Sequence, residues 1–270
     1  MENYQTIQVE LDGPLVTLWL SRPEVHNALN ALMIRETGHF FSRIEEMQEI
    51  RFVIIRGRGK SFCSGADLQW MKNAFSLENQ ENLMESQELS EMFRSIFQSS
   101  KIVIAAVHGN VFGGGNGLAA VCDLAYCTAD SRFSLSETRI GMAAVSITPY
   151  LMQKMKVADL KELIFSAKEF NGDEAVKYGL IIQSFPSQET MDLHINQTIN
   201  LMMQNGNKAL TSSKQLINKL AMQPISGIME QIPGLLAHIR VSQEAQEGFS
   251  AFLEKRKPNW GTNHRIESDK

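Results

Sequence analysis

Apolar and alternating segments of the N-terminal half have the pattern of β-strands. Residues 4–11 alternate polar with apolar side chains, Asp12-Gly13-Pro14 predicts a turn, and residues 15–20 predict a second strand, so the segment predicts a β-hairpin. Residues 52–56 and 102–107 are apolar at nearly every position, which is typical of strands buried on both faces. These strands predict a layered domain with a sheet at its centre.

Helical patterns lie between and after these strands. Asn30 precedes apolar residues at helical spacing and is expected to cap a helix, and residues 76–99 predict a polar helix with one apolar side. Residues 124–127 predict a further strand, whereas from about Glu162 onward the chain is expected to be mostly helical, with helical periodicity over 207–260. The alternation of strands and helices predicts an α/β fold with crossover connections.

The composition is that of a globular protein. Hydrophobic residues make up 43% of the chain and charged residues 21%, which argues against disorder. A net charge of −4 argues against nucleic-acid binding, because phosphate recognition normally shows a basic excess. All apolar runs are shorter than the roughly 18 residues of a membrane span.

Cysteine usage and ligand spacing carry two further expectations. The three cysteines, Cys63, Cys122 and Cys127, form an odd and unpatterned set that suits reduced thiols, so we expect a cytoplasmic protein. Since no His, Cys and carboxylate residues share the spacing of metal ligands, we expect no metal.

Residues 59–68 are the first segment with candidate chemistry. Glycine and small residues follow a buried strand there, so backbone N–H groups can approach a ligand closely. Asp67 could cap a helix that begins at Leu68, and a plain strand-to-helix turn is the alternative interpretation. For Cys63 we expect a buried hydrophobic role rather than a nucleophilic one, because no histidine can be assigned to it.

A glycine-rich run at 113–117 is the second segment. Four glycines just before a helix expose N–H groups at the positive helix end, which suits an anion or an oxyanion. Gly115, Gly117 and Ala120 also fit a dinucleotide pattern, but that fingerprint should follow its strand directly and here it does not. His108, at a strand end, is expected to be structural.

Glu137 is the candidate of the third segment, 133–142. Small and apolar residues surround it, and a carboxylate in such a place has a raised proton affinity that suits general acid/base chemistry. The alternative is an exposed glutamate paired with Arg139.

In this order, the segments resemble the enoyl-CoA hydratase/isomerase (crotonase) superfamily. The resemblance covers almost the whole chain, including matches to the family's R-P-x-x-x-N-A-L near the N-terminus and F-x-E-K-R-x-P near the C-terminus. Six motifs carry it: residues 22–29, 64–68, 105–109, 113–115, 122–124 and 252–258.

What the resemblance implies for the fold is a crotonase-like spiral of β-β-α units followed by helices that assemble subunits. The core would span residues 1–205, the helical trimerisation region 206–262 and a frayed tail 263–270. The implied assembly is a homotrimer or a hexamer made of two trimers.

For the site, the resemblance implies an acyl-CoA thioester substrate and no separate cofactor. The backbone N–H groups of Ala66 and Gly114 would hold the thioester oxygen. Lys255 matches a position that reaches the CoA phosphates in relatives, sometimes across a subunit boundary. Other substrate or CoA contacts would come from Val25, His26, Ala28, Ser64, Gly65, Asp67, Leu68, Gly113 and Gly117.

The catalytic carboxylates depart from the common pattern of hydratases. Gly117 stands where those enzymes carry a glutamate, whereas Glu137, 20 residues later, matches their second one. The resemblance therefore implies a lyase that adds or removes water with one glutamate, an isomerase that uses the same glutamate, or a non-catalytic acyl-CoA-binding subunit. We expect the missing side chain at Gly117 to leave space for a branched or carboxylated acyl group.

Finer similarity favours one substrate. Residues 65–71, 113–118 and 136–141 resemble G-A-D-L-x-W-M, G-G-G-x-G-L and S-E-x-x-L-G of bacterial methylglutaconyl-CoA hydratases of leucine degradation. Ala144 departs from them, since relatives usually carry proline there. A substrate carboxylate would need a cation such as Arg139 or Lys72, unless these are surface charges.

Overall fold

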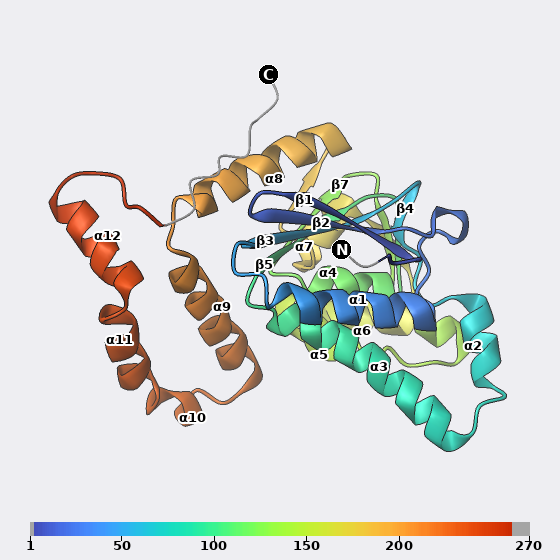
Figure 1. The fold of residues 1–270 in the computed structure, drawn as a ribbon. Coiled ribbons are helices and arrows are strands. Elements are labelled where there is room, and N and C mark those ends of the chain that lie inside the picture. The colour runs from blue at the N-terminus through green and yellow to red at the C-terminus, as the bar shows by residue number, and fades with distance from the viewer. Residues whose placement is uncertain (1–2, 261–270) are drawn as a thin grey trace.

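A six-stranded sheet forms the centre of the computed structural model, which describes residues 3–260 (Figure 1). The β1–β2 hairpin is antiparallel, as predicted, and every other neighbouring pair is parallel. In order across the sheet, the strands are β1 (Ile7–Asp12), β2 (Leu15–Leu20), β3 (Phe52–Gly57), β5 (Ile102–Val107), β7 (Leu124–Thr128) and β10 (Gln183–Phe185).

A smaller sheet lies beside the first and is built from strands of three residues. It contains β4 (Ser61–Cys63), β6 (Asn110–Phe112), β8 (Arg132–Ser134) and β9 (Glu169–Asn171). Since β4, β6 and β8 each follow a strand of the larger sheet, the chain winds as a spiral of β-β-α units, which confirms the expected fold class. After Glu162 the chain is mostly helical, as expected, and the short strands β9 and β10 interrupt it. The sequence did not predict these two strands, because three residues are too few to show a period.

Helices cover both faces of the larger sheet. On one face α1 (Ala31–Ile44) and α3 (Asn79–Gln98) lie side by side, and on the other α8 (Gln188–Met203) packs through its apolar side (Figure 1). Asn30 caps α1 as predicted, since its side chain accepts a hydrogen bond from Met33 N at 2.8 Å. The other core helices are α2 (Leu68–Ala74), α4 (Gly114–Val121), α5 (Thr148–Lys154), α6 (Val157–Ser166) and α7 (Gly172–Tyr178), with 3₁₀ turns η1 (Pro23–Val25) and η2 (Glu137–Ile140).

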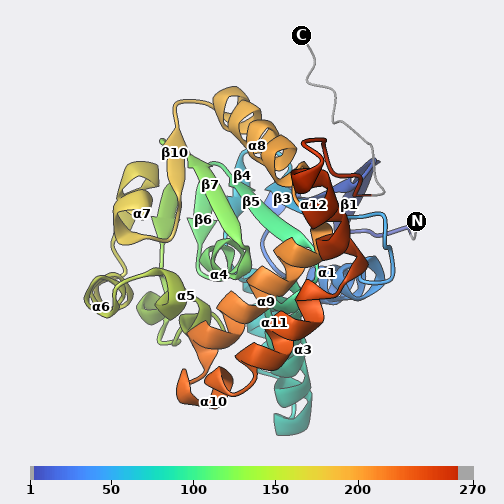
Figure 2. The same ribbon diagram turned by 90° about the vertical axis from the view of Figure 1, so that its left-hand side faces the viewer.

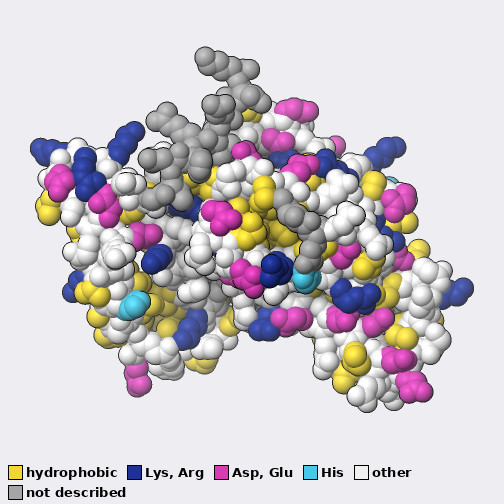
Figure 3. Space-filling model, viewed as in Figure 1, with side chains coloured by type: hydrophobic (Ala, Val, Ile, Leu, Met, Phe, Trp, Pro, Cys, Tyr) yellow, Lys and Arg dark blue, Asp and Glu magenta, His cyan; other side chains and the backbone are white. Residues whose placement is uncertain are grey.

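Four C-terminal helices form an arm that stands apart from the sheets (Figures 1 and 2). They are α9 (Asn207–Met222), α10 (Ser226–Met229), α11 (Ile232–Arg240) and α12 (Gln243–Leu253). Hydrophobic side chains reach the surface of this arm, as Figure 3 shows on its left-hand side. Within residues 3–260, no helix is both long and apolar enough to cross a membrane. The predicted tail, 263–270, lies outside the described residues.

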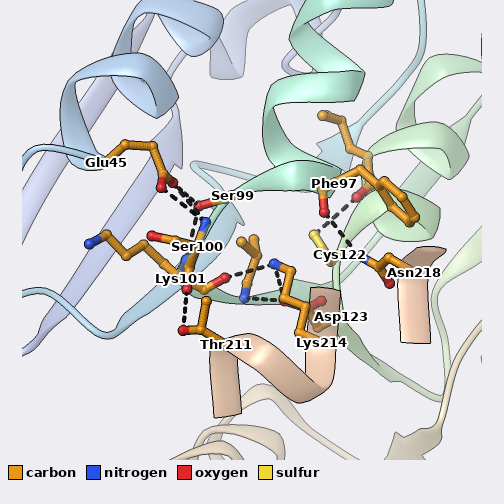
Figure 4. Close-up of polar contacts among 12 residues, drawn as sticks. Glu45, Phe97, Ser99, Ser100, Lys101, Cys122, Asp123, Thr211, Lys214 and Asn218 are labelled. Atoms are coloured by element: carbon orange, nitrogen blue, oxygen red, sulfur yellow. Dashed lines mark hydrogen bonds and ion pairs between the residues drawn. The ribbon is translucent and has the colours of Figure 1, made fainter. Parts of the chain in front are cut away.

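Side chains of α9 fix the arm to the core. They donate hydrogen bonds to backbone carbonyls at the junction of α3 and β5: Thr211 to Ser100 at 2.9 Å, Lys214 to Lys101 at 2.7 Å and Asn218 to Phe97 at 3.1 Å (Figure 4).

A buried ion pair strengthens this attachment. The Lys214 ammonium lies 2.7 Å from Asp123 Oδ2, and the two side chains are 5% and 17% exposed. The same carboxylate accepts a hydrogen bond from Val103 N at 2.7 Å, so it links α9 to the start of β5 and β7. Because burial by itself raises the pKa of Asp123, its charge depends on these partners.

Replacing Lys214 with methionine should destabilise the protein by about 3 kcal/mol, because the Asp123 carboxylate loses its cation while it stays buried. Urea unfolding measures the change. The double variant Lys214→Met/Asp123→Asn should lose less than the single one. Lys208→Met, which removes an exposed cation from the same helix, should change stability by less than about 0.5 kcal/mol. Equal values for Lys214→Met and Lys208→Met would contradict the role of the pair.

Candidate functional site

Two glycine-containing loops meet where β4 and β6 end. A β-carbon on Gly65 would lie 3.0 Å from Phe112 O, and one on Gly113 would lie 3.8 Å from Gly65 Cα. Both glycines have positive φ angles, +95° and +46°, which other residues rarely adopt. Both positions therefore require glycine for two reasons: the backbone conformation and the close approach of the two loops.

Each loop supplies one backbone N–H group without a backbone acceptor among the described residues. Leu29 bridges Ala66 in a parallel arrangement through Leu29 N to Gly65 O (2.7 Å) and Asp67 N to Leu29 O (2.9 Å). This bridge leaves the N–H of Ala66 itself unused. Gly114 is the first residue of α4, so its N–H precedes the intrahelical hydrogen bonds. Both groups can donate to an oxyanion, and Gly114 also lies at the positive end of α4.

The structure brings Glu137 to the same place. Its Oε1 would lie 3.2 Å from a β-carbon on Gly113, so the carboxylate lies against the glycine loop. Oε2 is buried and has no hydrogen-bond partner within the described part of the chain. Burial raises the pKa of Glu137, as we expected from its apolar surroundings. Arg139 does not pair with it, since its guanidinium donates to Ala167 O at 2.6 Å.

The wall beside Gly117 contradicts one expectation. A β-carbon on Gly117 would lie 2.2 Å from Ile147 Cγ2 and 3.0 Å from the Phe93 ring. The absent side chain therefore leaves no free space for an acyl group, because Ile147 and Phe93 fill it. Gly117 itself is buried in α4, so these two apolar side chains, rather than a second carboxylate, occupy this side of the helix.

Asp67 stabilises the loop that contains Ala66. Its Oδ1 caps α2 by accepting from Gln69 N and Trp70 N, which confirms the predicted cap. Its Oδ2 pairs with Arg22 at 2.8 Å, and Arg22 also donates to Ala28 O at 2.6 Å. The carboxylate is thus engaged by groups of the protein and holds the Ala66 loop against residues 22–28.

Of the residues expected to hold CoA, Val25, His26 and Ser64 are linked by hydrogen bonds, whereas Gly117 and Lys255 lie elsewhere. Ser64 N donates to His26 O at 3.0 Å, and Ser64 Oγ donates to Val25 O at 3.4 Å. Ala28 is buried and its N–H donates to Val25 O at 3.1 Å, and Leu68 is exposed at the start of α2. Lys255 lies apart from them, because it follows α12 at the far side of the arm (Figures 1 and 2).

Other candidate residues have structural or surface positions. Cys63 is fully buried and burial raises its pKa to about 12, which confirms a hydrophobic role. His108 is buried and its Nε2 lies 3.0 Å from Gly59 O, as a structural histidine should. Lys72 is exposed on α2. No group of His, Cys, Asp and Glu side chains among residues 3–260 could hold a metal ion.

Leu29 is the residue that sequence reasoning missed. It bridges Ala66 with its backbone, and its Cδ1 would lie 2.9 Å from a β-carbon on Gly114. One buried residue therefore contacts both loops, one through its backbone and the other through its side chain. The available signal was its position as the last residue of the R-P-x-x-x-N-A-L match, which we assigned to CoA binding only through its neighbours.

Known proteins resemble this chain over nearly its whole length. The model of a family described as enoyl-CoA hydratase/isomerase matches residues 12–263. A crotonyl-CoA hydratase of Syntrophomonas wolfei is 30% identical over 259 residues, which are 95% of this chain and 98% of the relative. A peroxisomal Δ(3,5)-Δ(2,4)-dienoyl-CoA isomerase of Arabidopsis thaliana is 27% identical and covers 96% of this chain and 98% of its own.

The fold has close counterparts as well. The crystal structure of an enoyl-CoA hydratase from Shewanella pealeana superimposes with a TM-score of 0.90 at 27% identity. The match covers 95% of this chain and 96% of that one, so the C-terminal arm is part of the shared architecture.

Gly117→Ala should destabilise the protein by about 1–3 kcal/mol, because the added methyl group would overlap Ile147. Gly234→Ala is the matched control: Gly234 is also helical, but its β-carbon would meet nothing within 4 Å, so alanine should add about 0.5–1 kcal/mol of stability. In a double-mutant cycle followed by urea unfolding, Gly117→Ala should cost less when Ile147 is also alanine. Additive effects would show that the two side chains do not compete for this space.

Proposed function

The chain belongs to the enoyl-CoA hydratase/isomerase family of enzymes, and we propose that it adds water to, or removes water from, an enoyl-CoA double bond. The observation that carries the proposal is the Glu137 carboxylate. It is partly buried, has an Oε2 without a partner among the described residues and lies against the Gly113 loop. A merely binding subunit has no need of an acid held in this way.

The two backbone donors would stabilise the charged intermediate. The N–H groups of Ala66 and Gly114 would donate to the thioester oxygen, which becomes an enolate oxyanion during the reaction. Because the glycine loops are fixed by their own close contacts, these donors need little reorganisation in the transition state. The start of α4 adds the positive end of the helix dipole.

Glu137 would carry both proton transfers of hydration. The ionised carboxylate removes a proton from water while the water oxygen bonds to the β-carbon of the enoyl group. The electron pair of the double bond moves onto the thioester oxygen, and protonated Glu137 then delivers its proton to the α-carbon. The net change is the addition of one water molecule. Because Ile147 and Phe93 occupy the side of Gly117, no second carboxylate shares this work there.

Isomerisation is the second candidate, and the apolar wall at Gly117 favours it. A single base can remove a proton from one carbon of an acyl chain and return it to another, with no water molecule to hold. In that reaction Glu137 would move a proton between the α- and γ-carbons over the same two backbone donors.

For the acyl group we propose 3-methylglutaconyl-CoA. The support is the motif similarity at residues 65–71, 113–118 and 136–141. A cation also lies close in sequence to Glu137, since Arg139 is in the same 3₁₀ turn and its side chain is anchored on Ala167 O. Free space at Gly117 no longer supports this substrate.

We also propose that the arm, residues 206–262, assembles the protein into a trimer or a pair of trimers. Large apolar side chains of α9, α11 and α12, such as Ile217, Leu236 and Phe252, are 52–82% exposed in the single chain. In such an assembly, Lys255 would bind the CoA phosphates of a neighbouring subunit.

Light scattering tests the proposed trimer or hexamer, because a monomeric mass in solution would contradict it. A cytoplasmic location stays a prediction.

Glu137→Gln should lower kcat by at least about 10²-fold, because the amide cannot exchange protons with the substrate. In the wild-type protein, kcat/KM for hydration should rise with pH through the pKa of Glu137, which burial places above 4.5, since the ionised form is the base. Loss of the conjugated thioester absorbance measures both. Glu230→Gln, an exposed control, should behave as wild type. Near-normal activity of Glu137→Gln would refute the assignment.

The substrate class is tested by comparing 3-methylglutaconyl-CoA with crotonyl-CoA. We expect a higher kcat/KM for the former, and Arg139→Ala should reduce this preference about tenfold if a charge-assisted hydrogen bond is lost. Lys72→Ala tests the other exposed cation in parallel. A clear preference for the straight chain would overturn the proposed substrate. A shifted double bond without water uptake would identify the isomerase.

A further inference from the structure

Asn116 is a fully buried amide in the first turn of α4, where its neighbours are glycine and aliphatic residues. Its Nδ2 lies within hydrogen-bond distance of three backbone carbonyl oxygens: Ser134 O at 2.9 Å, Val111 O at 3.0 Å and Gly113 O at 3.3 Å. It occupies the variable position of G-G-G-x-G-L, so the motif does not account for it.

These carbonyls belong to the two segments that carry the reacting groups. Gly113 directly precedes the N–H donor of Gly114, and Ser134 ends β8, three residues before Glu137. The last ladder pair between β6 and β8 is Phe112 with Ser134. Beyond it the chain enters α4 on one side and η2 on the other.

Two hydrogen bonds continue the connection past the end of the ladder. Gly113 N donates to Ser134 O at 3.0 Å, and Asn116 Nδ2 donates to the same oxygen. Asn116 N also donates to Gly113 O at 2.9 Å. The amide therefore clamps the glycine loop to the strand that leads to Glu137.

A buried amide is a costly way to fill this position. Asn116 Oδ1 has no hydrogen-bond partner in the described part of the chain, and an unpaired buried acceptor destabilises a protein. An aliphatic residue of similar size would avoid that cost. The opposite amide orientation would turn Oδ1 toward the carbonyl oxygens, so the nitrogen must face them.

We propose that Asn116 is a positioning residue, an inference that rests on the proposed function. It would hold the Gly114 N–H and the Glu137 carboxylate at the separation that one bound acyl-CoA requires. The N–H acts on the thioester oxygen and the carboxylate acts on carbon atoms of the same substrate. A shift of about 1 Å between such groups can cost about 10²-fold in rate. Asn116 limits this shift because it holds both segments.

The variant to test is Asn116→Leu, which keeps the approximate volume and removes the donor. Asn218→Leu is the matched control. It also removes a side-chain amide that donates to a backbone carbonyl, Phe97 O, but Asn218 lies in the arm. We expect kcat per folded protomer to fall about 10²-fold in Asn116→Leu, with KM changed less than about threefold. Asn218→Leu should keep the wild-type kcat. If Asn116→Leu does not fold, Asn116→Ala replaces it.

A second measurement does not depend on turnover. The carbonyl stretching band of a bound, saturated acyl-CoA reports how strongly the N–H donors polarise the thioester, and it should lie closer to the free-ligand frequency in the Asn116 variant than in wild type. A variant with lowered thermal stability but an unchanged band and unchanged kcat would reduce Asn116 to a structural role and overturn the inference. If wild type hydrates and isomerises no enoyl-CoA, the proposed function fails, while the band comparison still decides the role of Asn116.

Discussion

The close contact between the Gly65 and Gly113 loops is the constraint on which the site depends. Two backbone segments can meet at this distance because neither carries a β-carbon, and both adopt left-handed conformations. The contact brings the N–H groups of Ala66 and Gly114 to the ends of adjacent short strands. The absence of a β-carbon at Gly113 also lets the Glu137 carboxylate lie against this loop. The two backbone N–H groups are therefore positioned by main-chain geometry, and Leu29, Asp67 and Asn116 make hydrogen bonds that hold the same loops.

Helix α4 connects this contact to the rest of the molecule. Its first residue carries an N–H donor, its middle packs against Ile147 of the segment leading into α5, and its last carbonyls accept hydrogen bonds from the buried Lys154 ammonium. Just beyond that end, Asp123 pairs with Lys214 of the arm. A cation at the carboxyl end of α4 interacts favourably with the helix dipole, whose positive end lies at the site. The arm and the site are thus attached to opposite ends of one short helix.

Elements with a repeated pattern could be predicted from the sequence, and elements set by contacts between distant residues could not. The hairpin, the buried strands and the caps at Asn30 and Asp67 follow from local chemistry and agree with the structure. The strands β4, β6, β8 and β9 have three residues each, too few for a period. The roles of Ala66 and Gly114 came from family resemblance, since a backbone N–H leaves no mark in the sequence. Ile147 fills the space beside Gly117, and this contact joins residues 30 positions apart in the sequence, so no local pattern indicates it.

That packing also restricts which substitutions residue 117 can accept. A mutation that introduced a second carboxylate at residue 117 would first collide with Ile147 Cγ2 and the Phe93 ring. Making room would require a smaller residue in the core, and that intermediate would be less stable before any catalytic gain appeared. A carboxylate at residue 117 therefore requires a second, compensating substitution at a residue packed against it. The shape of the hydrophobic core around Ile147 and Phe93 therefore determines which side chains residue 117 can carry.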